Sequence, residues 1–245
     1  MYWQDYIWFI FAMLLCMVFS AFASARVHSS FAKNNNVRCR SGLTGRDAVT
    51  RLMRANGVND ISVGCVNGEL TDHYHPSKKI VNLSESTYNN DSVAAVAVAA
   101  HEIGHVMQNQ NGYLPYRLRT ALVPVVNIGS RLAMPLVLVG LLIDMFVNLS
   151  NSETGFYIAM IGVILYGGSL LFALVTLPVE LNASNRARKM LLAEGILTEA
   201  EIPAAKEVLS AAALTYLASI LTSLVYFLRF LFYVLTMFGR RNNRR

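Results

Sequence analysis

The sequence predicts a mostly α-helical, polytopic membrane protein with about four transmembrane helices and a small α+β region outside the membrane. Two observations support this fold class. Hydrophobic residues make up 54% of the 245 residues and charged residues only 15%, whereas ordinary soluble domains carry roughly 25% charged residues. Several apolar runs are also long enough to cross a bilayer, which takes about 20 residues. The composition therefore excludes a disordered chain and argues against a soluble globule.

The first apolar run, residues 6–25, is expected to be a transmembrane anchor. An alternative is a signal peptide, because Ala23, Ser24 and Ala25 fit a small-residue cleavage pattern. Signal peptides begin with a positively charged segment, but the residues before this run offer only the negative charge of Asp5. We therefore expect the run to be retained as an anchor.

The next two spans are expected to form a hairpin. Residues 120–149 are apolar but contain Arg131 and Asp144, and charged residues inside spans usually face a bundle interior or lie near an interface. Residues 154–179 are uncharged throughout. The polar residues 148–155 between the two runs are typical of a turn.

The fourth apolar segment, residues 208–238, is expected to be either a single span or a segment that bends back, because Arg229 interrupts it. A basic tail, residues 239–245, follows and is expected to anchor the chain at the membrane surface. The two segments left outside the membrane are residues 26–119 and 180–207. We expect them to assemble into one extramembrane region.

The most specific motif is His101-Glu102-Ile-Gly-His105, which has the form HExxH. An Ala-rich run that forms helix readily precedes it, with Asp91 or Ser92 as a possible N-cap. Residues four apart share one face of a helix, so both imidazoles can reach a single metal ion. Glu102 then points at a metal-bound water. The alternative is a pair of structural histidines inside a buried helix.

Glu180 is the expected third metal ligand. A metzincin would place a third His six residues after His105, but that position holds Asn111. Glu180 directly follows the third span, and a hairpin that crosses and returns would bring it to the face where the motif helix lies. Pro178 suits the first turn of a new helix, which would fix the Glu180 side chain. The alternative is a carboxylate that only stabilises a helix N-terminus.

These motifs together resemble the YugP-type family of bacterial membrane zinc metallopeptidases. The resemblance rests on the HExxH motif, on PVELNASNRA at 178–187, on LTDHYHP at 70–76 and on IVNLS at 80–84. It covers nearly the whole chain, including the order of the spans. His75 departs from the pattern, because the family's run is expected to have an acidic residue there.

The resemblance implies a gluzincin-like site within a small zincin-like catalytic region. In such a site His101, His105 and Glu180 bind Zn²⁺ and Glu102 is the catalytic acid and base. The chain is more distantly similar to the HtpX and Ste24 membrane proteases, in which the Glu ligand is followed four residues later by Asp. Here that position is Ser184, so the role of that Asp does not carry over.

Further candidates surround these residues. Residues 79–84 alternate like a short strand, which is either purely structural or an edge along which an extended substrate peptide pairs. Arg186 or Arg188 could stabilise an oxyanion; the alternative is pairing with acidic neighbours or lipid phosphate. His73 and Tyr74 are additional candidates, with no spacing argument behind them.

The sequence therefore predicts a membrane-embedded zinc-dependent endopeptidase. A zinc-activated water would lose a proton to Glu102, which would deliver it to the leaving amine. The expected partners are a peptide or membrane-protein substrate and the lipid bilayer, with no nucleic acid. An alternative is a non-catalytic membrane scaffold or adaptor whose structural zinc site is completed by Cys39 or Cys65. A transporter, suggested by Arg131 and Asp144, would leave the HExxH motif unexplained.

We expect a multi-pass protein of the bacterial cell membrane with its active site facing the cytoplasm. Orientation follows the Lys and Arg residues close to span ends. These lie mainly in the two extramembrane segments: Arg26, Lys33, Arg38, Arg40, Arg117, Arg119, Arg186, Arg188 and Lys189. Four simple spans would, however, export the basic tail. A bend within residues 208–238 would remove this conflict. The alternative is an inverted topology, in which the active site faces the outside.

Overall fold

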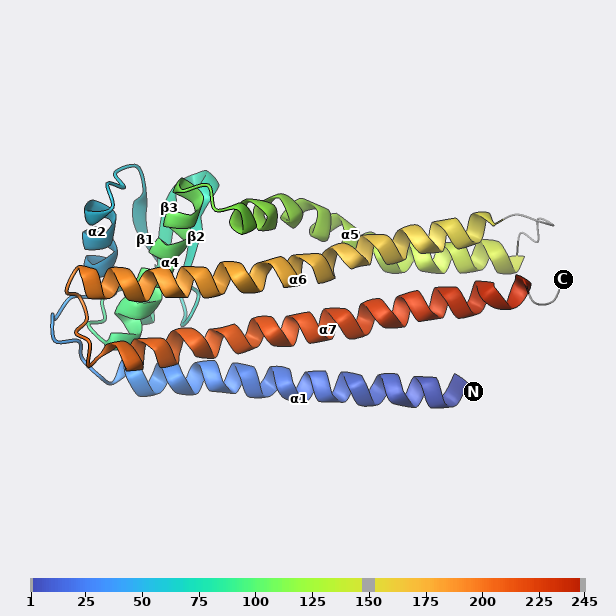
Figure 1. Cartoon of the computed structure of the whole chain (residues 1–245), viewed down its shortest axis with the longest axis horizontal. Coiled ribbons are helices and arrows are strands. Elements are labelled where there is room, and N and C mark those ends of the chain that lie inside the picture. Colours follow the sequence, from blue (N-terminus) through green and yellow to red (C-terminus); the bar gives the residue numbers. More distant parts are fainter. Residues whose placement is uncertain (1, 147–152, 243–245) are drawn as a thin grey trace. The chain divides into compact units, whose positions relative to one another are not determined.

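The structure is a computed structural model, and it describes residues 2–146 and 153–242 (Figure 1). The chain divides into two compact units. The first unit combines the N-terminal residues up to Ser20 with Leu118–Thr176 and the residues from Tyr216 onward. The second unit combines Ala21–Arg117 with Leu177–Thr215. Every residue with a predicted catalytic or metal-binding role belongs to the second unit.

The longest helices are α1 (Tyr2–Asn35), α5 (Leu114–Phe146), α6 (Thr154–Ala193) and α7 (Ile202–Asn242). Within the described residues, four helices are long and apolar enough to cross a membrane, over Tyr6–Asn35, Leu114–Ile143, Thr154–Ala193 and Ile202–Thr236. A helix rises about 1.5 Å per residue and the hydrocarbon core is about 30 Å thick, so each helix is longer than a span requires. The predicted fold class, a mostly α membrane protein with about four transmembrane helices, is confirmed.

The C-terminal apolar segment is part of one continuous helix, α7. The alternative in which residues 208–238 bend back is therefore wrong, because the helix runs through Arg229 without a break. The polar turn expected at 148–155 falls mostly on residues 147–152, which lie outside the described residues. The last part of the basic tail, 243–245, also lies outside them.

In the first unit, small residues bring α5 and α6 into close contact. A Cβ atom at Gly162 of α6 would lie 2.7 Å from the carbonyl oxygen of Ala133 on α5. Small residues at such contacts are typical of helices that pack inside a membrane. Large apolar side chains on both helices are exposed instead, as expected for surfaces that face lipid; they include Val125, Ile128, Leu132, Ile161, Ile164 and Leu171.

Pro178 lies inside α6, so the prediction that it begins a new helix is wrong. Proline lacks the N–H that would bond to the carbonyl four residues earlier, but long membrane helices tolerate such a loss. The helix continues past it because Ala187 and Leu191 are completely buried in the core of the second unit. Glu180 therefore lies on the same helix as the third predicted span.

The second unit contains a three-stranded sheet in the order β1 (Ser62–Val66), β3 (Ile80–Ser84), β2 (His73–His75). β1 runs parallel to β3, and β2 runs antiparallel to it with Tyr74 opposite Val81. The strand predicted at 79–84 is present, but both its neighbours are paired with it. The expectation that it is an edge strand open to a substrate is therefore wrong, and β2 and β1 are the edges.

Three helices lie wholly within the second unit: α2 (Gly45–Ala55), α3 (Glu85–Tyr88) and α4 (Val93–Gln110). Their apolar side chains meet the sheet in one core. Leu52 of α2, Leu83 of β3, Ile103 of α4 and Leu191 of α6 are all completely buried there. The core thus fixes α4 against the C-terminal half of α6, although the two helices are far apart in the sequence.

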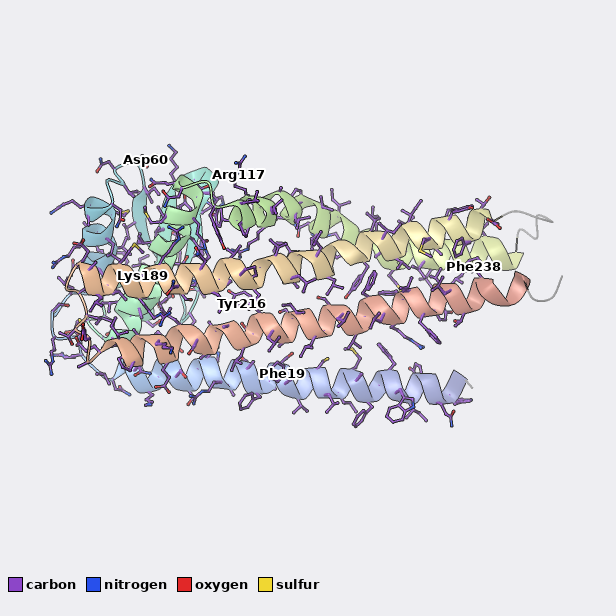
Figure 2. All side chains as sticks on the ribbon, in the orientation of Figure 1. Phe19, Asp60, Arg117, Lys189, Tyr216 and Phe238 are labelled. Carbon is purple, nitrogen blue, oxygen red and sulfur yellow. The ribbon has the colours of Figure 1, made fainter. Side chains whose placement is uncertain are left out.

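Polar contacts fix the connection between β2 and β3. His75 Nδ1 accepts a hydrogen bond from the backbone N–H of Lys78 at 3.3 Å and caps the short 3₁₀ helix η1 (Pro76–Lys78). An acidic side chain accepts the same kind of bond at a helix N-cap, so His75 performs a structural task in place of the expected acid. Next to it, Lys79 Nζ donates to Asp60, which is labelled in Figure 2, at 2.8 Å.

Candidate metal centre

The HExxH motif lies on α4, a largely buried helix. Of the two expected N-caps, Ser92 is the one used, because its Oγ accepts a hydrogen bond from the backbone N–H of Ala95 at 3.0 Å. The small side chains before the motif are completely buried, including Ala95, Ala97, Ala99 and Ala100. Alanine combines high helix propensity with a small volume, so α4 can lie deep in the second unit.

His101, His105 and Glu180 converge on one point. Glu180 Oε2 lies 3.1 Å from His101 Nε2 and 3.4 Å from His105 Nε2. The two imidazole rings are almost perpendicular, with centroids 4.7 Å apart. Glu180 is 3% exposed and His105 is 8% exposed. The structure therefore brings together the three residues that the sequence marked as ligands, with His105 and Glu180 buried and His101 partly buried.

The three side chains fit a zinc ion. Zinc in proteins takes imidazole nitrogen and carboxylate oxygen at about 2.0–2.2 Å in a tetrahedral arrangement, which places neighbouring ligand atoms roughly 3.3–3.6 Å apart. The two distances from Glu180 to the histidines, 3.1 and 3.4 Å, are close to this separation. Candidate ligand atoms of all three residues lie within 4.8 Å of one another. Three protein ligands leave one tetrahedral position open, as in catalytic zinc sites.

Each histidine also has a partner at its other ring nitrogen. His101 Nδ1 lies 3.1 Å from Ser184 Oγ, and His105 Nδ1 lies 3.0 Å from Gln108 Oε1. Such partners orient metal-binding imidazoles and raise their basicity. Ser184, where the HtpX and Ste24 proteases have Asp, therefore contacts a candidate ligand through its hydroxyl. The sequence provided no basis for that role.

Gly104, inside the motif, allows α6 to approach α4. A Cβ atom at this position would lie 2.6 Å from the carbonyl oxygen of Ala183 and 3.0 Å from its Cα. These are backbone atoms of α6, so they cannot move aside as a flexible side chain could. The absence of a side chain at Gly104 therefore lets Glu180, less than one turn from Ala183, reach the two histidines.

We expect Gly104→Ala to weaken zinc binding and to destabilise the protein, because the added methyl group forces α4 and α6 apart. Overpacking of this kind typically costs about 1–3 kcal/mol. The matched control is Gly168→Ala on α6, where the added Cβ meets only a Val125 methyl carbon at an ordinary 3.8 Å. Zinc content and thermal unfolding of the purified variants check this. Zinc affinity and stability equal to wild type in Gly104→Ala would contradict the close-packing account.

Glu102 points away from solvent, beside β2. It is 7% exposed. Burial raises the pKa of the Glu102 carboxyl to about 7, together with the charges of Asp72 and Glu180, against the lowering effects of His101 and of a backbone hydrogen bond from Tyr74. A carboxyl group with a near-neutral pKa can both accept and return a proton at physiological pH. The arrangement therefore suits acid–base chemistry next to the three converging side chains.

The remaining candidates lie in different surroundings. Arg186 Nε donates to Asn182 Oδ1 at 2.8 Å, and Arg188 donates to Asn185 Oδ1 at 3.1 Å. His73 contacts the backbone oxygen of Thr71 at 2.9 Å through one nitrogen, and the side chain of Asn82 through the other. His73 is thus part of the β2–β3 pairing. Tyr74 is the exception, since its backbone contacts Glu102.

Sequence reasoning missed Gln108 and Asn182. Gln108 is completely buried, and its Nε2 donates to the backbone oxygen of Val179 at 2.7 Å and to Asn182 Oδ1 at 3.0 Å. One signal was present in the sequence, because Gln108 follows His105 by three residues and so shares a helix face with it. Nothing local indicated its two bonds to α6.

Two comparisons with known proteins found relatives of this chain. The family model described as "Putative neutral zinc metallopeptidase" matches residues 8–235. The chain is also 40% identical over 235 residues to a curated protein of Bacillus subtilis (strain 168), "Putative membrane protease YugP"; the alignment covers 96% of this chain and 99% of that protein. No solved structure gives a significant match.

Proposed function

The chain belongs to this family of neutral zinc metallopeptidases, and from that premise we propose that it is a membrane-embedded, zinc-dependent endopeptidase. The resemblance to the YugP-type family is thereby confirmed, and the cofactor is Zn²⁺. We assign His101, His105 and Glu180 as the zinc ligands and Glu102 as the general base and acid. The single observation that carries this assignment is the buried convergence of the three ligand side chains on α4 and α6.

The proposed reaction is hydrolysis of a peptide bond by water. When bound, Zn²⁺ supplies a Lewis acid that lowers the pKa of a coordinated water towards 7. Glu102 takes a proton from the attacking water, whose oxygen adds to the scissile carbonyl carbon. The C–N bond then breaks, and Glu102 delivers its proton to the leaving nitrogen. The carboxyl product keeps the water oxygen, so atoms and charges balance.

Strand β2 is our candidate for the surface that aligns the substrate. It pairs with β3 on one side only among the described residues, and the backbone of Tyr74 on this strand bonds to Glu102. An extended peptide that pairs with an edge strand is held by main-chain hydrogen bonds, largely irrespective of its sequence. We propose that peptides or unfolded segments of membrane proteins bind in this way, with no nucleic acid involved.

The alternative of a scaffold with a structural zinc site finds little support. Structural sites are usually closed by four ligands, many of them Cys. Cys39 is buried and its Sγ contacts Ser41 Oγ at 3.3 Å, while Cys65 is exposed on β1. Among the residues that the structure describes, the group able to hold a metal ion consists of His101, His105 and Glu180 and contains no cysteine.

Removal of the metal tests the proposed function. We expect the detergent-solubilised full-length protein to cleave casein, an unstructured test substrate, and to lose this activity when a chelator strips zinc. Stoichiometric Zn²⁺ should restore it, because the ligands are side chains of the folded protein and remain in place. Cleavage that continues without metal would contradict the proposal, as would a zinc-loaded protein that cleaves neither casein nor proteins of its own membrane.

We further propose that this is a multi-pass protein of the bacterial cell membrane whose catalytic segments face the cytoplasm. More Lys and Arg residues flank the spans in these segments than elsewhere. Because α7 is one continuous helix, four spans place the N-terminus and the basic tail together on the outer side. The arginines of the tail favour the opposite orientation, but the Lys and Arg residues that flank the spans in the catalytic segments are more numerous.

Thiol labelling tests this orientation. Cys65 is exposed, whereas Cys16 and Cys39 are buried, so Cys65 is the thiol that a reagent reaches. We expect a membrane-impermeant maleimide to leave Cys65 unmodified in intact cells and to label it in inverted membrane vesicles. Cys65→Ser supplies the background. Labelling of Cys65 in intact cells would reverse the orientation and place cleavage outside.

A further inference from the structure

We propose that Gln108, held by Val179, Asn182 and Arg186, fixes His105 in the form that carries its proton on Nδ1 and offers its Nε2 lone pair to the metal. The proposal rests on the proposed function, because it assumes His105 is a zinc ligand. It makes Gln108, Asn182 and Arg186 positioning residues, a role that the sequence predicted for none of them. Arg186 thereby acts away from the substrate.

The outermost residue of this network is Arg186. A guanidinium group is always protonated and only donates hydrogen bonds. Arg186 Nε donates to Asn182 Oδ1 at 2.8 Å, and its guanidinium carbon lies 6.0 Å from the ring centroid of Tyr113. The cation therefore has an aromatic ring beside it and an amide oxygen in front of it. This contact fixes the oxygen of the Asn182 amide towards Arg186.

Gln108 is the middle of the network, and it is completely buried. One end of its amide faces two oxygen atoms: the backbone oxygen of Val179 at 2.7 Å and Asn182 Oδ1 at 3.0 Å. Both oxygens only accept, so the NH₂ end of Gln108 must face them. An amide turned the other way would bury oxygen against oxygen and leave donors unsatisfied, which is costly in a protein interior. The orientation of Gln108 is therefore determined.

The orientation of Gln108 determines the proton position on His105. Gln108 Oε1 lies 3.0 Å from His105 Nδ1, and an amide oxygen only accepts, so Nδ1 must carry the proton. A neutral imidazole then has its lone pair on Nε2. This is the nitrogen that faces Glu180 Oε2, at 3.4 Å. His105 is thus held with the metal-binding nitrogen directed at the other ligands.

The same bonds tie the ligands on the two helices together. Gln108 and His105 belong to α4, whereas Val179, Asn182 and Glu180 belong to α6. Val179 directly precedes Glu180, so the bond from Gln108 to the Val179 oxygen fixes the backbone next to the third ligand. Loss of the Gln108 amide would therefore loosen His105 and Glu180 at once.

Zinc affinity of variants tests the network. In the purified full-length protein, Gln108→Leu should weaken zinc binding by about 10–100-fold, the usual effect of removing the partner of a metal-binding histidine. Asn182→Leu should weaken it less, because Val179 still holds Gln108. Asn182→Asp should bind zinc like wild type, because only an acceptor is needed between Gln108 and Arg186. Asn185→Leu, one turn along the same helix, is the control.

A direct observation of the His105 proton separates this role from simple packing. In zinc-loaded protein labelled with ¹⁵N-histidine, the Nδ1–H signal of His105 should be slow to exchange with water in wild type and in Asn182→Asp. It should exchange fast in Gln108→Leu. If Gln108→Leu does not fold, the pair Asn182→Leu and Asn182→Asp still decides the matter through zinc affinity.

Two results would overturn the network. One is zinc affinity and proton exchange in Gln108→Leu equal to wild type; the other is Asn182→Asp as weak in zinc binding as Asn182→Leu. Neither depends on peptidase activity. If His105→Ala retained wild-type zinc affinity, the proposed zinc site itself would be wrong, and with it the premise of the network. If only the network were wrong, His105→Ala would still lose its zinc.

Discussion

Replacement of Glu102 by Gln is expected to abolish peptide-bond cleavage while zinc binding stays at one ion per chain. Glutamine has nearly the same shape as glutamate but cannot accept the proton of the attacking water. General acid–base catalysis by one side chain contributes about 10²–10⁴-fold to the rate, and Glu102 performs both proton transfers in the proposed reaction. Its carboxylate is not among the three converging ligand side chains, so the metal should remain. Cleavage of labelled casein and metal analysis of the same preparation measure both quantities.

Glu85→Gln is the matched control, because Glu85 is an exposed carboxylate in α3 of the same unit. It should cleave at the wild-type rate. Substantial activity in Glu102→Gln would remove Glu102 from the mechanism. Loss of zinc in Glu102→Gln would instead make Glu102 a ligand, and the assignment of roles would have to change.

Replacement of Glu180 by Ala is expected to lose both zinc and activity. The change removes the ligand supplied by α6 and leaves two histidines on α4. Changes to residues that only orient a ligand cost about 10–100-fold in metal affinity, so the loss of a ligand should cost more. Metal titration of the purified variant against a competing chelator measures this loss.

Glu199→Ala provides the comparison, because Glu199 is exposed, shortly after α6 ends. That variant should retain wild-type zinc affinity. Normal zinc affinity in Glu180→Ala would mean that another group is the third zinc ligand, and it would contradict the assignment of Glu180 on α6. A Glu180→Ala variant that binds no zinc but keeps the wild-type circular dichroism spectrum, and is therefore folded, would support Glu180 as the third ligand.

The features predicted well from the sequence were those with a local signal. Long apolar runs, two of them interrupted by charged residues, mark the four helices long enough to span a membrane, because the length that a bilayer requires is fixed. The HExxH spacing places His101 and His105 on one helix face. Glu180 could also be named, since a span that returns limits where the third ligand can emerge, and the structure brings it to the two histidines.

Features that depend on contacts between distant segments were not predicted. Pro178 is a local signal for a helix start, but burial of the residues after it keeps α6 continuous. The pairing of β3 on both sides depends on two short strands that have little alternation of their own. The bonds from Gln108 to α6 join residues about 70 positions apart, a separation at which neither periodicity nor spacing carries information.

X-ray absorption at the zinc K-edge of the purified, zinc-loaded protein identifies the atoms that bind the metal. We expect a zinc ion with two imidazole nitrogens and only oxygen atoms besides them, at about 2.0–2.2 Å, and no sulfur. We also expect the spectrum of Glu102→Gln to show the same two imidazoles. Sulfur at about 2.3 Å would rule out the proposed catalytic zinc site, because it would mean that a cysteine completes a closed structural site.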